Sequence, residues 1–326
     1  MKNIDNSTLV YPLFSSDFFS AYLITMRPYL LFVSGMTGLT GMALSGNNSL
    51  IQLILIFIAS FLSYGFGQAL TDCFQVDTDS ISSPYRPLTQ GKINKAQVLS
   101  ISITGLLLCV TIFTFYNFYN LLLGTISGLG LVTYTTFKRK WWSGPFYNSW
   151  IVAVLFLISF GAASGAKTLI FSFSFILTIS TVFFGYANFV LSGYFKDISA
   201  DAVTGYNTLP VKFGRRVSAI VSDVFAILAA VSSGIIILSK AGYTVPLAAI
   251  LFYSAGLVLS LISQIKLHKV KTDEEAHPAI SLTVHAYILL LSSVAIMNRP
   301  SWGILLTVYY LLFNIVMKLR PSKCQV

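Results

Sequence analysis

The fold is decided by residues 68–91, which have the sequence QALTDCFQVDTDSISSPYRPLTQG. This stretch follows about twenty apolar residues, 51–70, so its carboxylates stand at the mouth of a predicted membrane helix. Ionisable groups in such a position are costly and usually functional. If the helix continues to residue 79, four polar side chains lie on one face, at i, i+4, i+7 and i+11: Gln68, Asp72, Gln75 and Asp79. The stretch therefore predicts a one-sided polar stripe at the end of a membrane span.

A second acidic stretch has the same setting. Residues 194–214, YFKDISADAVTGYNTLPVKFG, end another long apolar run, residues 169–191. Asp197 and Asp201 are one helical turn apart, so they share a helix face. The sequence therefore predicts two acidic half-sites at equivalent depths in the membrane.

Composition identifies the class of protein. The 326 residues are 55% hydrophobic and 10% charged, with a mean hydropathy of +0.76, and the apolar residues are arranged in runs of about twenty. The net charge of +10 would suggest nucleic acid in a soluble chain, but most basic residues lie in short loops between apolar runs, which is typical of membrane topology. We expect an all-α, polytopic membrane protein with no nucleic-acid partner.

The three cysteines exclude two further classes of protein. They are widely spaced, too few for a disulfide framework, and part of no Cys-x-x-Cys or Cys/His pattern. Neither redox chemistry nor a zinc site is expected.

Hydropathy predicts ten membrane spans in a single transmembrane domain covering residues 1–326. The last two are separated only by residues 298–301, so one of them could be re-entrant and the true count nine. The spans lie near residues 22–44, 51–71, 96–116, 119–137, 147–166, 169–193, 217–238, 243–264, 279–297 and 302–318.

The basic residues predict the orientation of these spans. Of the 21 Lys and Arg residues, only Lys167, Lys240 and Arg299 fall on one side, and the other 18 fall on the opposite side. Because Lys and Arg concentrate in cytoplasmic loops, both termini and both acidic stretches are expected in the cytoplasm. The loops on that side are also the long ones, so substrate chemistry is expected to face the cytoplasm.

A weak internal repeat relates two halves of the chain, about residues 20–140 and 145–275. Each half places an acidic motif after its second span, with Asp72 and Asp197 125 residues apart, and a basic loop after its fourth span. Such duplication in membrane folds puts a site at the interface between the repeats. The two acidic faces are therefore expected to converge.

The chemistry of the convergent site follows from its residue types. Four carboxylates near one cavity repel one another unless a cation neutralises them. Oxygen ligands without His or Cys favour Mg²⁺, which prefers to bridge carboxylates to substrate phosphates. Basic side chains stand where a diphosphate would need them: Arg86, Lys138, Arg139 and Lys196. The implied substrate is a lipid diphosphate whose tail lies in the helical bundle.

These residues resemble the motifs of the UbiA superfamily of intramembrane prenyltransferases, and the resemblance covers about residues 20–300. The similar stretches are TDCFQVDTD at 71–79 with PYRPL at 84–88, KDISAD at 196–201 with TLPV at 208–211, YTTFKR at 134–139, and the Arg27-Pro28 pair. The resemblance implies a bundle of about nine helices around a central cavity open to lipid. It also implies an enzyme that transfers the prenyl group of an isoprenyl diphosphate to an aromatic or other electron-rich acceptor.

The resemblance also implies roles for individual residues. The catalytic carboxylates would be Asp72, Asp79, Asp197 and Asp201, which with Gln75 would hold Mg²⁺. The diphosphate would be bound by Arg27, Gln75, Arg86, Tyr134, Lys138, Arg139 and Lys196.

The first motif departs from the family pattern at two positions. Thr71 stands where the family has Asn, and Gln75 stands where it has the middle Asp; Asp77 lies beside that position and could compensate, although it would point away from Asp79 on a helix. An altered first motif keeps open a UbiA-type terpene cyclase, which ionises the prenyl diphosphate and uses no acceptor. A transporter built on repeats is a third alternative, but it would need carboxylates at mid-membrane depth.

Overall fold

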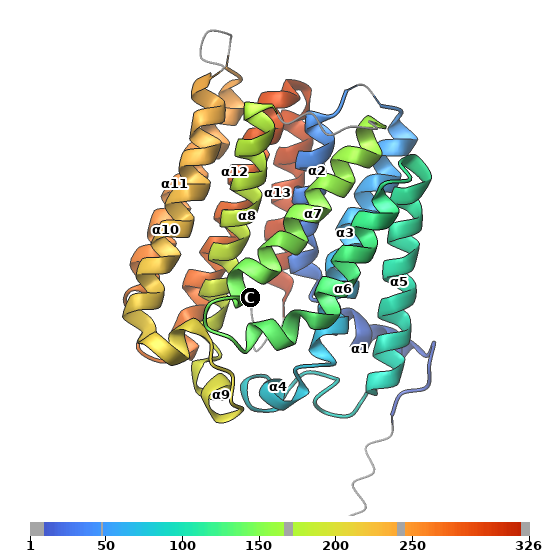
Figure 1. Ribbon diagram of the computed structural model, residues 1–326, viewed down its shortest axis with the longest axis vertical. Coiled ribbons are helices and arrows are strands. Elements are labelled where there is room, and N and C mark those ends of the chain that lie inside the picture. The colour runs from blue at the N-terminus through green and yellow to red at the C-terminus, as the bar shows by residue number, and fades with distance from the viewer. Residues whose placement is uncertain (1–9, 47, 166–171, 240–244, 321–326) are drawn as a thin grey trace, which may run out of the picture.

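The protein is a bundle of long α-helices that stand side by side (Figure 1). The computed structural model describes residues 10–46, 48–165, 172–239 and 245–320, so Lys167 and Lys240 of the topology prediction lie outside the described residues. The helices are α1 (Ser16–Met26), α2 (Leu31–Leu44), α3 (Leu50–Asp72), α4 (Val76–Ser82), α5 (Lys95–Tyr116), α6 (Asn120–Lys138), α7 (Gly144–Ser164), α8 (Phe173–Tyr194), α9 (Ile198–Val203), α10 (Leu209–Ser239), α11 (Leu247–Leu267), α12 (His277–Asn298) and α13 (Gly303–Leu319).

The expected class of fold is confirmed. Within the described residues, eight helical segments are long and apolar enough to cross a membrane, and the two other predicted spans correspond to the shorter α2 and to α6. The two last predicted spans are both complete helices, α12 and α13, joined by a 3₁₀ turn at Pro300–Trp302. The chain is therefore an integral, multi-pass membrane protein.

Helix α12 forms the centre of the bundle, where it packs against α2, α8 and α11. Almost all of its side chains are buried, and its polar groups find partners on neighbouring helices. Tyr287 shares a hydrogen bond of 2.7 Å with Thr37 of α2, and Thr283 shares one of 2.7 Å with Ser263 of α11. Such pairs are needed because no water reaches polar groups inside a bilayer.

The first predicted span, 22–44, is interrupted in the structure. Helix α1 ends at Met26, and Arg27 adopts a left-handed conformation with φ of 54° before Pro28 opens a short 3₁₀ turn into α2. Proline has no N–H and disfavours the helical conformation in the residue before it, so the helix stops here. Helix α1 packs against α3 at the same end of the bundle as α4 and α9 (Figure 1).

The condition that the helix continues to residue 79 is not met. Helix α3 ends at Asp72, Gln75 has a non-helical backbone (φ −124°, ψ 17°), and α4 begins at Val76. The second motif is built in the same way, because α8 ends at Tyr194 and α9 begins at Ile198. The similar construction agrees with the expected repeat, which stays a prediction.

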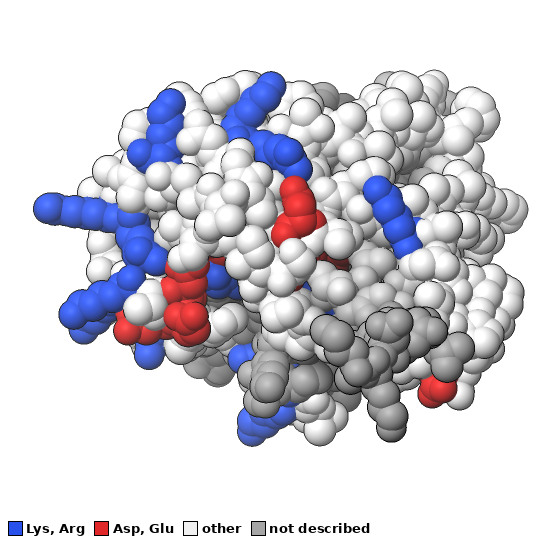
Figure 2. Space-filling view, turned by 90° about the horizontal axis from the view of Figure 1, so that it is seen from below, with Lys and Arg blue, Asp and Glu red and all other residues white. Residues whose placement is uncertain are grey.

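The two short helices meet beneath the bundle. Helices α4 and α9 are in contact, and Thr78 shares a hydrogen bond of 3.0 Å with Thr204 (Figure 1). Seen from this end, Lys and Arg side chains gather mostly over the left and upper parts of the face, with a few Asp and Glu side chains near them (Figure 2). Both acidic motifs therefore lie at one end of the bundle, as the basic loops predicted.

Candidate active site

A polar cavity of about 100 Å³ lies between the two acidic motifs, where α3, α4, α6 and α8 approach one another. Most of its wall is polar or aromatic, although the surrounding helices are apolar. Its lining comprises Arg27, Leu30, Tyr64, Gln68, Asp72, Gln75, Asp79, Arg86, Tyr134, Lys138, Asn148, Tyr186, Phe189, Val190, Gly193, Tyr194, Lys196 and Asp197.

The first half-site is a compact set of ion pairs. Asp72 at the end of α3 accepts hydrogen bonds from the Arg27 guanidinium at 2.9 and 3.0 Å, and from Gln68 at 2.7 Å. Asp79 of α4 accepts a hydrogen bond from Arg86, whose Nη1 also lies 3.7 Å from Asp72. The four residues of the predicted polar stripe all line the cavity, although the helix is broken before α4.

Lys138, the last residue of α6, connects the two half-sites. Its ammonium donates a hydrogen bond of 2.9 Å to Gln75 Oε1 and lies 3.8 Å from Asp201 Oδ1. It also lies 5.5 Å and 5.1 Å from the ring centres of Tyr194 and Tyr206, within range of cation–π attraction. Gln75, which stands where the family pattern has Asp, therefore has Lys138 as its hydrogen-bond partner.

The charges of the two half-sites balance within the chain. Four carboxylates, from Asp72, Asp79, Asp197 and Asp201, are matched by four cations, from Arg27, Arg86, Lys138 and Lys196. The basic residues of the chain therefore supply part of the charge that neutralises the carboxylates.

Burial shifts the pKa values of ionisable groups that lie outside the membrane spans. Burial raises the pKa of Asp79, and Arg86 opposes the change; burial likewise raises the pKa of Asp201 to about 6, which Lys138 opposes. Burial lowers the pKa of Lys196 to about 7 against the attraction of Asp197. Opposed perturbations of this kind are common where a site is arranged for charged ligands.

The donor atoms fit a magnesium ion. Among the described residues, Asp197 Oδ1 and Asp201 Oδ1 are buried and have no hydrogen-bond partner, an arrangement that a cation would satisfy. All the available ligands are oxygens, which suits Mg²⁺. No group of three or more His, Cys, Asp or Glu side chains in the described part of the chain is close enough to form a ready metal site. The carboxylates are held instead by Arg and Lys, so a metal would exchange with these pairs.

Two of the predicted site residues lie outside the lining of the cavity. Arg139 is half-exposed and pairs with Asp77 at 2.9 Å, and it stacks over the ring of Tyr206 at 4.4 Å. Asp201 is fully buried and reaches the site through Lys138. The nine others line the cavity: Arg27, Asp72, Gln75, Asp79, Arg86, Tyr134, Lys138, Lys196 and Asp197.

Four polar side chains of the wall were not among the predicted site residues: Tyr64, Asn148, Tyr186 and Tyr194. Tyr64 precedes Gln68 and Asp72 by one and two helical turns, and Tyr194 and Tyr186 precede Asp197 by about one and three turns, so extending each stripe backwards would have found them. Tyr194 shares a hydrogen bond of 3.1 Å with Tyr134. Asn148 of α7 has no such signal, because only the fold brings it to the cavity.

Comparisons with known proteins agree with this architecture. A family model described as the UbiA prenyltransferase family matches residues 32–291. A digeranylgeranylglyceryl phosphate synthase of Thermococcus kodakarensis is 28% identical over 74% of this chain and 87% of its own length.

Solved structures have the same fold. A UbiA homologue from Aeropyrum pernix superposes with a TM-score of 0.67 at 16% identity, covering 81% of this chain and 96% of that one. A UbiA homologue from Archaeoglobus fulgidus, solved with DMAPP and Mg²⁺ bound, gives a TM-score of 0.62 at 15% identity, covering 92% and 99%.

Proposed function

The chain belongs to the UbiA prenyltransferase family, and we propose that it is a Mg²⁺-dependent intramembrane prenyltransferase. It ionises an isoprenyl diphosphate, transfers the prenyl group to an electron-rich acceptor and releases pyrophosphate. The observation that carries the proposal is the convergence of two acidic motifs and their basic partners on one cavity at the end of the bundle. The relation to a synthase that is named for a prenylated product supports it.

In this proposal the carboxylates hold magnesium. The ligands are drawn from Asp72, Asp79, Asp197 and Asp201, with the neutral amide oxygen of Gln75 in place of a fifth carboxylate. These residues would hold Mg²⁺, which would supply positive charge to stabilise the negative charge that develops on the leaving group. The homologue solved with DMAPP and Mg²⁺ supports this choice of metal.

The basic residues bind the diphosphate. Arg86 and Arg27 offer guanidinium groups that match phosphate oxygens, and Lys138 and Lys196 supply compact positive charges from the other side of the cavity. Each is already close to a carboxylate of the site or is buried beside one, so binding of a magnesium diphosphate exchanges one set of ion pairs for another. The site therefore needs little rearrangement to accept its charged substrate.

The aromatic wall serves the prenyl group. Cleavage of the C1–O bond leaves an allylic cation, which ring faces stabilise and water would quench. Tyr134, Tyr186, Phe189 and Tyr194 line the same cavity as the carboxylates, and Tyr186 and Phe189 lie further inside α8 than its last residue, Tyr194. The prenyl chain is expected to leave the site between these rings and the apolar helices.

The lining favours transfer over cyclisation. A terpene cyclase needs a closed apolar cavity around the folded chain, whereas this wall carries several tyrosine hydroxyls and the amide of Asn148. Such groups suit a polar acceptor beside C1. The acidic motifs are proposed to face the cytoplasm, where the chain has most of its basic loops.

Product analysis tests the proposal. Purified protein in detergent with Mg²⁺ is incubated with geranyl, farnesyl or geranylgeranyl diphosphate, with and without aromatic and alcohol acceptors, and the products are extracted for mass spectrometry. We expect a prenylated acceptor together with an equal amount of pyrophosphate. A cyclic hydrocarbon formed without an acceptor would contradict the proposal and establish the cyclase.

A further inference from the structure

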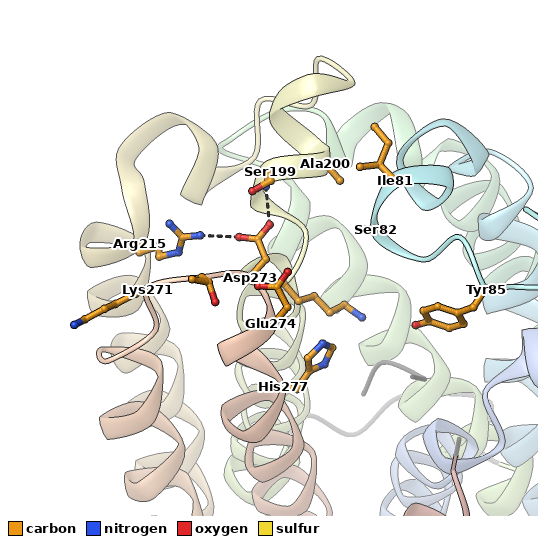
Figure 3. A pocket seen from close by; sticks show the side chains of 12 residues that line it. Ile81, Ser82, Tyr85, Ser199, Ala200, Arg215, Lys271, Asp273, Glu274 and His277 are labelled. Atoms are coloured by element: carbon orange, nitrogen blue, oxygen red, sulfur yellow. Dashed lines mark hydrogen bonds and ion pairs between the residues drawn. The ribbon is translucent and has the colours of Figure 1, made fainter. Parts of the chain in front are cut away.

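A second and larger cavity, of about 450 Å³, lies next to the first and shares Lys196 with it. It opens at the same end of the bundle, between α4, α9, the start of α10 and the loop that leads into α12 (Figure 3). Ile81 and Tyr85 form one side, and Arg215, Asp273 and His277 face them from the other (Figure 3). Lys196 is therefore the one residue proposed to bind the diphosphate that also lines this second cavity.

Arg215 is fixed in the wall of this second cavity. Its guanidinium donates a hydrogen bond of 2.6 Å to Asp273, whose other oxygen accepts 2.8 Å from the Ser199 backbone N–H (Figure 3). These contacts join the loops that carry α9 and α12. The Nε of Arg215 is buried and has no hydrogen-bond partner among the described residues, so the fixed guanidinium keeps a donor unused.

Basic side chains outnumber acidic ones in the lining of the second cavity. Lys196, Arg215 and Lys271 line it, against the two carboxylates of Asp273 and Glu274, and His277 adds a further group that donates a hydrogen bond. Asp273 is already neutralised by Arg215. A fixed guanidinium with an ammonium nearby is suited to a phosphate group.

We propose that this second cavity binds the phosphate headgroup of the acceptor, which makes the acceptor a phosphate-bearing lipid alcohol. The proposal rests on the proposed function, because it places an acceptor beside the diphosphate site. Because Lys196 lines both cavities, an acceptor phosphate in the second cavity would lie next to a diphosphate in the first. The product name of the Thermococcus kodakarensis relative, a glyceryl phosphate, has the same chemistry.

Every bond, electron pair and proton in the transfer to such an acceptor is accounted for. The hydroxyl oxygen supplies the electron pair for the new C–O bond at C1, and the C1–O bond to the diphosphate breaks with its electrons leaving on pyrophosphate. The hydroxyl proton passes to water at the open end of the second cavity. No oxidant, reductant or further substrate is needed.

Acceptor kinetics test the proposal, with geranylgeranyl diphosphate as donor and either geranylgeranylglyceryl phosphate or its dephosphorylated alcohol as acceptor. Arg215→Gln should raise the KM for the phosphate acceptor about tenfold, with the KM for the donor unchanged. Its KM for the alcohol should also be unchanged, and Arg215→Lys should recover part of the loss. Arg216→Gln is the matched control, because Arg216 is exposed and lies outside the lining. Equal use of both acceptors by the wild type, or an equal effect of Arg215→Gln on both, would overturn the proposal.

Binding without turnover separates this proposal from the proposed function. Thermal unfolding is followed in detergent and EDTA, with geranylgeranylglyceryl phosphate, the alcohol or inorganic phosphate added. Stabilisation by the lipid phosphate that Arg215→Gln abolishes would support the headgroup site, even if no prenyl transfer were detected. Stabilisation by inorganic phosphate but not by the lipid would assign the cavity to free phosphate, and no stabilisation by either would also overturn the proposal.

Discussion

At the scale of single residues, Lys138 and Arg139 are neighbours in the sequence with different surroundings. Lys138 is buried between Gln75 and Asp201, whereas Arg139 pairs with Asp77 at the surface. An exposed pair is screened by water and salt, but a buried carboxylate that loses its partner keeps its full cost of desolvation. The two residues therefore offer a matched comparison of a buried cation with an exposed one.

Replacement of each cation tests this difference. Lys138→Gln should lower the free energy of unfolding, measured in mixed micelles without Mg²⁺, by about 3–5 kcal/mol, because Asp201 is left buried and unpaired. Arg139→Gln should lower it by about 1 kcal/mol or less. An equal loss in the two variants would contradict the assignment of Lys138 to the buried link between the half-sites.

At the scale of helices, α2 carries a glycine at its contact with α7. A Cβ added at Gly41 would lie 2.7 Å from the backbone carbonyl oxygen of Phe156 in α7. Backbone cannot rotate away as a side chain can, so the two helices would have to separate. Small residues serve this purpose generally in membrane bundles.

Two glycine substitutions are expected to change the stability of the protein in opposite directions. Gly41→Ala should lower the melting temperature in detergent, corresponding to about 1–3 kcal/mol of overpacking. Gly128→Ala in α6 is the control, because nothing lies within 4 Å of its added Cβ, and alanine favours helix by up to about 1 kcal/mol. A stabilised Gly41→Ala protein would show that the α2–α7 contact is looser than described.

The regularity of helices explains why the sequence predicts the membrane spans and the polar stripe. Runs of apolar residues located the spans because membrane helices satisfy their own backbone, and helical periodicity collected Gln68, Asp72, Gln75 and Asp79 on the cavity side. Periodicity does not reveal the break at Gln75, whose non-helical backbone lies between the end of α3 and the start of α4.

Other features of the site cannot be predicted from the sequence, because they depend on the tertiary structure. Lys138 and Arg139 carry equal signals in the sequence, and only the end of α6 determines which of them points inward. Asn148 reaches the first cavity from a helix far from the acidic motifs in the chain, and the second cavity is likewise formed by segments far apart in the chain. Residues brought together only by tertiary structure leave no local pattern to read.

At the scale of the whole molecule, the two ends of the bundle differ in charge and length of loop. The end with α4 and α9 carries the acidic motifs and many basic residues (Figure 2), whereas Arg299 lies at the other end and donates a hydrogen bond of 2.7 Å to the Ser45 carbonyl. Basic residues are retained on the cytoplasmic side, which predicts a cytoplasmic site.

Cysteine labelling tests this orientation. In a Cys324→Ser background, Ser80→Cys in α4 and Ser301→Cys after α12 place exposed thiols at opposite ends, while Cys73 and Cys109 are buried. A membrane-impermeant maleimide should label the position 301 thiol in right-side-out vesicles and the position 80 thiol in inverted ones. The reverse pattern would place the site outside the cytoplasm.

The most direct test of the account is whether both acidic motifs act on one diphosphate. Mg²⁺-dependent pyrophosphate release from an isoprenyl diphosphate in the presence of an acceptor is measured for the wild type, Asp72→Asn and Asp197→Asn. Asp223→Asn is the control, because Asp223 pairs with His268 away from the cavity lining. We predict that each motif variant loses at least about a hundredfold in kcat/KM, as removal of charge stabilisation from a reacting group generally does, while Asp223→Asn keeps its activity. Near wild-type release by either motif variant would contradict a shared site.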